Sequence, residues 1–252
     1  MNPRFSVLAI AIALAGAGLA LAAPAEAQFI PGTSPMDMSA HSRALTSSVI
    51  NRNALGATAR RNPGTRTPAT PRPAPAGGFD VQSDARFPFQ ASPALREQVM
   101  NEVINRTRRS SPEAGQAIAA EFRRPDFQQR FANAVRPFGF SPDDAADVMA
   151  VYLVAGWEIV HGTDANPTAL RAVRRQVAGQ MARSVALRDP TTRARLAEEL
   201  KIITTLFLSS VENAKREGAA AQFAAAVAAH YRQTTNQDLR TLRLTAQGFS
   251  DR

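Results

Sequence analysis

The sequence predicts an all-α protein: a single orthogonal or irregular bundle of six to seven helices, preceded by a signal peptide and a disordered arm. The first observation is a recurring pair, a capping residue followed by proline, which begins at Ser92. Such a pair is typical of a helix start, because the cap oxygen accepts an N–H of the first turn and proline needs no partner there. The second observation is that apolar residues recur every three or four positions, whereas no segment keeps the two-residue period of a strand, so we expect no sheet.

Residues 1–27 have the pattern of a secretory signal peptide. A basic start at Arg4 leads into an apolar stretch and then into PAEA, which favours cleavage after Ala27; cleavage after Ala22 or Ala23 is the alternative. An uncleaved anchor would need about 20 strongly apolar residues, and this stretch is rich in alanine and glycine instead. We therefore expect export to the periplasm or the medium of a Gram-negative bacterium, with no transmembrane segment in the mature form.

Residues 28–78 are expected to form a disordered linker rich in proline and arginine. Residues 28–58 are polar, with at most a transient helix. The stretch RRNPGTRTPATPRPAPAGG contains five prolines, and this density holds a chain in an extended, polyproline-like form. We interpret it as a semi-rigid spacer, and a ligand for a proline-recognition domain is the alternative.

Residues 79–252 are expected to form the helical domain, with the aromatic strip FDVQSDARFPFQ lying against it as a strap. The predicted helix starts are Ser92-Pro93, Ser111-Pro112, a weaker Arg124-Pro125-Asp126, Ser141-Pro142, Asn166-Pro167 and Asp189-Pro190. A last helix, AAAQFAAAVAAHYRQ, follows Gly218, a residue suited to end the helix before it. The final DLRTLRLTAQGF forms a closing element to which we assign no type.

The chain is basic, with a formal net charge of +9 that is spread along its length. Such a charge favours anionic partners but does not bear on the fold. Export disfavours nucleic acid, so acidic envelope polymers or lipid head groups are the expected anions. The chain has no cysteine, which excludes a disulfide and a cysteine-linked lipid anchor.

The stretch MAVYLVAGWEIVHG, residues 149–162, is expected to lie in the central helix of the bundle. Its uncharged run, from Val148 to Trp157, is only half as long as a membrane span. Gly156 would let another helix approach closely. We expect Trp157 to fill the space beside this glycine and its indole N–H to find an acceptor near the helix end.

Glu158 and His161 are the candidate catalytic residues, since they lie one helical turn apart as E-x-x-H. This spacing allows a carboxylate and an imidazole to meet one metal in di-iron bundles. Such bundles need a second motif, however, and neither His41 nor His230 has a glutamate three residues before it. We therefore expect no metal and no cofactor.

Arg171, Arg174 and Arg175 are expected to make one face of their helix basic, as a possible anion-binding face opposite an apolar stripe. An ordinary solvated face is the alternative. The interleaved aromatic residues of a base-stacking surface are missing, which again disfavours nucleic acid.

Asp143, Asp144 and Asp147 follow Ser141 in the first turns of a predicted helix. Negative charge there meets the positive end of the helix dipole. The spacing lacks the glycine and the closing glutamate of a calcium loop. We therefore expect these aspartates to stabilise the helix start.

The string FGFSPDDAADVMAVYLVAGWEIVHG, followed by LRAVRRQV, LAEEL and DLRTLRLTAQGF, resembles an uncharacterised family of exported proteobacterial proteins, described only as a domain of unknown function. The resemblance covers about Phe87 to Phe249, behind a signal peptide and linker. It favours a single domain over two, and it supplies no activity, cofactor or catalytic residue that could be carried over to this chain.

The sequence thus favours a non-catalytic exported module that binds a protein or an anionic envelope polymer. The alternative is a hydrolase of envelope polymers that uses two carboxylates, such as Glu158 with Asp164 or Glu121 with Asp126. The pattern makes no prediction about the oligomeric state.

Overall fold

The computed structural model describes residues 42, 43, 46 and 82–251, so the predicted signal peptide and most of the predicted linker lie outside the described residues. Between residues 82 and 251 the chain is mainly helical, as the sequence predicts. The seven α-helices of this part are α4 (Pro93–Ser110), α5 (Pro112–Phe122), α6 (Phe127–Val135), α7 (Ala145–His161), α8 (Pro167–Met181), α9 (Pro190–Arg216) and α10 (Ala220–Thr235). Three 3₁₀ turns, η1 (Arg136–Phe138), η2 (Ala186–Arg188) and η3 (Leu239–Thr241), and two strands, β1 (Leu242–Thr245) and β2 (Gly248–Asp251), complete it.

Four of the predicted helix starts are confirmed with the cap hydrogen bond in place. The side chains of Ser92, Ser111, Asn166 and Asp189 accept the backbone N–H of Leu95, Ala114, Ala169 and Thr192. The start predicted at Pro142 is wrong by three residues, because Asp144 caps α7 in place of Ser141. The weaker start at Pro125 is displaced to Phe127, where Asp126 makes no side-chain cap bond.

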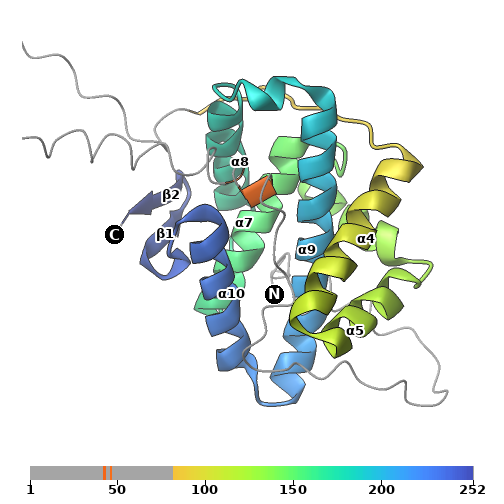
Figure 1. Ribbon diagram of the computed structural model, residues 1–252. Coiled ribbons are helices and arrows are strands. Elements are labelled where there is room, and N and C mark those ends of the chain that lie inside the picture. Colours follow the sequence, from red (N-terminus) through yellow and green to blue (C-terminus); the bar gives the residue numbers. More distant parts are fainter. Residues whose placement is uncertain (1–41, 44–45, 47–81, 252) are drawn as a thin grey trace, which may run out of the picture.

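The prediction that residues 149–162 belong to the central helix is confirmed. Helix α7 packs between α8 and α9 and also contacts α10, while α4 and α5 pack together on the outer side of α9 (Figure 1). Fourteen of its 17 residues are buried. A helix that is apolar nearly all round is stable only when neighbours cover every side, and α7 fits that description.

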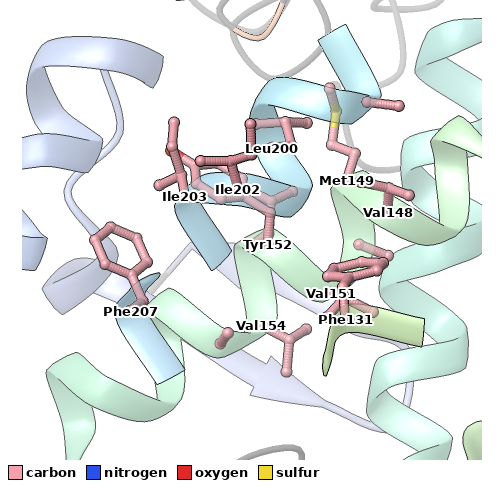
Figure 2. Packing of buried hydrophobic residues seen from close by; sticks show 14 of the residues in the cluster. Phe131, Val148, Met149, Val151, Tyr152, Val154, Leu200, Ile202, Ile203 and Phe207 are labelled. Carbon is pink, nitrogen blue, oxygen red and sulfur yellow. The ribbon is translucent and has the colours of Figure 1, made fainter. Parts of the chain in front are cut away.

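The core is built mainly where α7 meets α9. Figure 2 shows Met149 and Tyr152 of α7 beside Leu200 and Ile203 of α9, and Phe207 continues this contact toward α10. All five side chains are buried. Burial of a large apolar side chain stabilises a fold by roughly 1.5–3 kcal/mol, so this contact sets the position of α7 in the bundle.

Gly156 allows close approach of a helix, as expected, but a different aromatic residue uses the space. A Cβ at Gly156 would lie 2.3 Å from Cζ of Tyr231 on α10. Trp157 itself is only half-buried at the end of α7. Its indole N–H does find an acceptor near the helix end, the carbonyl oxygen of Leu242, at 3.2 Å.

We expect Gly156→Ala to lower the free energy of unfolding by about 2 kcal/mol, since overpacking a core costs roughly 1–3 kcal/mol. The ring of Tyr231 cannot easily move away. It stacks on the ring of Tyr152, with ring centroids 4.7 Å apart, and its hydroxyl donates to the Tyr152 carbonyl. Urea unfolding measures the loss. Adding Tyr231→Leu should remove the overlap, so the double variant should be at least about 1 kcal/mol more stable than additivity predicts; strictly additive losses would contradict the close contact.

The closing element is an antiparallel hairpin, so the expectation of no sheet is wrong for these eight residues. The side chain of Gln176 on α8 holds β2 by both backbone groups of Phe249: the Phe249 N–H donates to Oε1 at 2.9 Å, and Nε2 donates to the Phe249 carbonyl at 3.0 Å. A partner 73 residues away therefore stabilises strands too short to persist alone.

In residues 82–251, none of the helices combines the length and the apolar character that crossing a membrane requires.

The described part of the aromatic strip is a strap, as expected. The N–H of Ala145 donates to the carbonyl of Phe87, and the N–H of Phe89 donates to the carbonyl of Asp143. Phe89 is buried. The strap thus crosses the N-terminal end of α7.

Ser42, Arg43 and Thr46 fall within the linker that the sequence predicts to be disordered, yet these three residues are helical. Ser42 and Thr46 are also fully buried. They appear in orange among the helices of the domain in Figure 1.

Candidate functional site

The two candidate catalytic residues lie at the last turn of α7 but have different partners. Glu158 is only 1% exposed, and its Oε1 accepts the N–H of Ala165 at 2.9 Å from the loop before α8. Its Oε2 has no hydrogen-bond partner among the described residues. His161 instead stacks on Trp157, with ring centroids 4.4 Å apart, and its Nδ1 lies 3.0 Å from the Trp157 carbonyl oxygen.

The surroundings of Glu158 favour the neutral acid. Burial raises the pKa of the Glu158 carboxyl from 4.5 to about 8, since desolvation penalises the charged form; the Ala165 N–H opposes this shift and the charge of Asp164 adds to it. At neutral pH this carboxyl is therefore mostly protonated. It can donate a proton, but it is a poor ligand for a cation.

The three arginines predicted to form one basic face on α8 have three different surroundings. Arg171 is exposed, and Arg175 donates from Nε to Oε1 of Gln82 at 3.1 Å. Arg174 is only 6% exposed and points into the domain. The surface candidates on α8 are therefore Arg171 and Arg175.

Arg174 forms a buried ion-pair cluster with two aspartates of α7. Its Nε lies 2.8 Å from Oδ1 of Asp147, and its Nη2 lies 3.6 Å from Oδ1 of Asp144. Asp147 Oδ2 accepts the N–H of Ser141 at 2.8 Å, and Asp144 Oδ2 accepts the N–H of Phe87 in the strap at 2.8 Å. The cluster joins α7, α8 and the strap, so these aspartates do more than stabilise a helix start.

The carboxylate pair Glu121 and Asp126 is brought together around Arg130. The Arg130 side chain contacts Glu121 and donates from Nε to Asp126 Oδ2 at 2.8 Å. The hydrogen bond from Arg130 lowers the pKa of Asp126. Both carboxylates are thus paired with one cation, which suits an ion pair and not a proton donor.

A buried polar cluster between α7 and α10 was not predicted from the sequence. The hydroxyl of Tyr152 lies 2.8 Å from Nε2 of His230 and 3.5 Å from Oγ1 of Thr234. Burial raises the pKa of Tyr152 well above its usual value, so the phenol stays neutral. The spacing of His230, Tyr231 and Thr234 on one helix was the available signal, but nothing in it indicates Tyr152 as their partner.

A small open depression lies between α4, α6 and α9. Phe131 and Ile202 form part of its wall, and the buried Glu198 is paired there with Lys201 at 2.6 Å and with Arg96 at 3.6 Å. Charges of both signs therefore meet in it. Within the part of the chain that the structure describes, no three histidine, aspartate or glutamate side chains gather to hold a metal ion.

In the folded part of the chain, more carboxylates than cations are buried. Residues 82–250 contain 22 arginines and lysines and 17 carboxylates. Five carboxylates are buried, Asp144, Asp147, Glu158, Glu198 and Glu199, but only one cation, Arg174. Exposed and half-buried positions therefore carry 21 cations against 12 carboxylates. Four of these cations, Arg86, Arg96, Arg106 and Lys201, pair with the buried carboxylates, so the surface keeps the net basic character of the composition.

Residues 1–249 match the model of a family of unknown function, DUF6683. No curated protein and no solved structure matches the chain. Since the matched residues cover nearly the whole sequence, the chain belongs to the DUF6683 family.

Proposed function

We propose that the protein is an exported, non-catalytic helical module that binds an anionic polymer of the cell envelope. The observation that carries this proposal is the basic charge of residues 82–250, which hold 22 cations against 17 carboxylates and bury only one of the cations, Arg174. An excess of one sign over a surface attracts polyanions at long range. It favours a polymer of many negative charges over a protein partner, whose surface usually mixes both signs.

The buried carboxylates support a binding role because most of them hold the fold together. Asp144 and Asp147 pair with Arg174, and Glu198 pairs with Lys201. Exposed arginines such as Arg171 are then the groups that a polyanion meets first.

Retention on isolated bacterial cell walls tests the proposal. We expect the protein to bind at 0.1 M NaCl and to be released toward 1 M NaCl, since the screening length falls from about 10 Å to about 3 Å. The variant carrying Arg123→Gln, Arg171→Gln and Arg188→Gln changes three exposed residues. It should bind at least about threefold more weakly, because each cation contributes to polyanion attraction, and its melting temperature should be unchanged.

Two results would contradict this role: no retention at 0.1 M NaCl, or retention that salt and the triple variant leave unaltered. Beads of dextran sulfate and of uncharged dextran are the matched probes. Equal binding to both would mean that the interaction does not depend on negative charge.

A second candidate, a hydrolase acting on envelope polymers, is favoured by the raised pKa of Glu158 beside the negative charge of Asp164. A protonated carboxyl is the general acid that cleavage of a glycosidic bond requires. Release of soluble sugar fragments from cell walls by the unaltered protein, and not by Glu158→Gln, would favour this role over binding alone.

A further inference from the structure

Three residues that are distant from the domain in sequence lie against it in space (Figure 1). Ser42, Arg43 and Thr46 are helical, and Ser42 and Thr46 have no exposed surface. The hydroxyl of Ser42 donates to Oε2 of Glu199 on α9 at 2.5 Å, across 157 positions of sequence. The contact is therefore specific in its atoms as well as buried.

Glu199 provides the acceptor for this contact from inside the domain. It is a buried carboxylate, and its Oε1 receives Nη2 of Arg106 on α4 at 2.5 Å. Removing a carboxylate from water is costly unless both oxygens are hydrogen-bonded. Arg106 supplies a donor for one oxygen and Ser42 supplies a donor for the other, so the arm completes a site that α4 and α9 begin.

Thr46 indicates which kind of side chain fits the rest of this surface. It follows Ser42 by four positions, so the two side chains lie on one face of their helix. Its hydroxyl has no hydrogen-bond partner among the described residues, although it is fully buried. The surface thus requires a small side chain at both positions and a hydroxyl donor only at the first.

We propose that the surface around Glu199 and Arg106 is a binding site for a short helical segment with small side chains four residues apart, the first bearing a hydroxyl. The chain's own Ser42 and Thr46 occupy this site in the same molecule. The site recognises a helix by a carboxylate and a close fit, so it is independent of the basic outer surface and of polyanion binding.

The length of the intervening chain permits this occupancy within one molecule. Thirty-five residues separate Thr46 from Gln82. A segment of that length can span up to about 110 Å when extended, far more than the domain requires. The entropic penalty of closing such a loop grows only slowly with its length, so the arm can dock without strain, and a partner helix of the same chemistry must displace it.

Amide hydrogen exchange of the full chain, read by nuclear magnetic resonance, tests the docking. The amides of Arg43 and Thr46 should exchange at least about tenfold more slowly than in an unfolded peptide. Ser42→Ala should lose about tenfold of this protection, since it removes a hydrogen bond to a charged group. Thr46→Val keeps the shape and removes an unpaired hydroxyl, so protection should stay or increase; Thr46→Arg should abolish it.

The amides of α7 and α9 are the internal control, because none of these substitutions changes the domain itself. Free exchange at Arg43 and Thr46 in the unaltered chain, with α7 and α9 protected, would overturn the proposal. So would equal effects of Thr46→Val and Thr46→Arg. Protection that rises with protein concentration would show docking onto a second copy and would overturn the occupancy within one molecule.

A synthetic peptide of residues 38–50, MSAHSRALTSSVI, tests the site as a binding site. It should shift the amide signals next to Glu199 and Arg106 in the Thr46→Arg chain, where the site is empty. Binding to the unaltered chain should be at least about tenfold weaker, because the occupant is tethered at millimolar effective concentration. Failure of the peptide to bind the Thr46→Arg chain would overturn the assignment of a separate helix-binding site.

Discussion

Arg174→Ala is expected to lower the free energy of unfolding by about 3–5 kcal/mol, the usual effect of removing one partner of a buried ion pair. The side chains of Asp144 and Asp147 are nearly inaccessible to solvent, and both have an oxygen facing the Arg174 guanidinium. Without that guanidinium the two carboxylates keep their backbone donors, but the only cation left beside them among the described residues is Arg86, whose side chain is 61% exposed and lies 3.4 Å from Asp144 and 3.8 Å from Asp147. Chemical unfolding in urea, followed by far-ultraviolet circular dichroism, measures the loss.

Arg171→Ala is the matched control, because Arg171 lies one turn earlier on α8 and is exposed. Its effect should stay within about 0.5 kcal/mol, as for most surface substitutions. Similar losses for the two variants would mean that Arg174 does not differ from a surface arginine. Cell-wall retention should depend on Arg171 instead: Arg171→Ala should weaken retention, although it hardly changes the free energy of unfolding.

Glu158→Gln is expected to change how stability depends on pH. The pKa of Glu158 is about 8 in the folded state against 4.5 for an ordinary glutamate. The folded state therefore binds more protons between pH 4.5 and 8, and the stability contributed by this carboxyl is fully present below pH 4.5 and is lost as the pH rises through 8. The loss is on the order of 3–5 kcal/mol for a shift of this size.

Glutamine stays neutral over the whole range, so the melting temperature of Glu158→Gln should rise relative to the unaltered protein as the pH increases from 5 to 8.5. Other titrating groups affect both proteins equally and cancel in the difference. Glu97→Gln, at an exposed position on α4, should give a constant difference. A constant difference for Glu158→Gln as well would contradict the raised pKa.

Helix starts could be predicted from the sequence where the determining contact is local. The cap at Ser111 acts on Ala114, only three residues away, so the pattern contains all the necessary information. The start of α7 depends on Asp144, whose second oxygen accepts the N–H of Phe87 from 57 positions earlier. That competition with Ser141 cannot be read from a local pattern, which explains the error of three residues.

The candidate site shows the same limit. A helical period of 3.6 residues places Arg174 close to the apolar stripe of Leu170 and Val177. The sequence does not show that Asp144 and Asp147 lie opposite Arg174 in the fold. The sequence indicates Glu158 as a candidate catalytic residue, but it does not show that the loop bearing Ala165 covers this side chain. Which charged residues are buried is decided by partners on other elements, and these become visible only in the fold.

The Gln176 side chain has a consequence for self-association. A primary amide offers one donor and one acceptor, as a peptide group does, and Gln176 presents both to Phe249. It thus takes the place that a third strand would occupy beside β2. Open strand edges invite pairing between molecules and aggregation; here a single glutamine terminates the sheet at that edge.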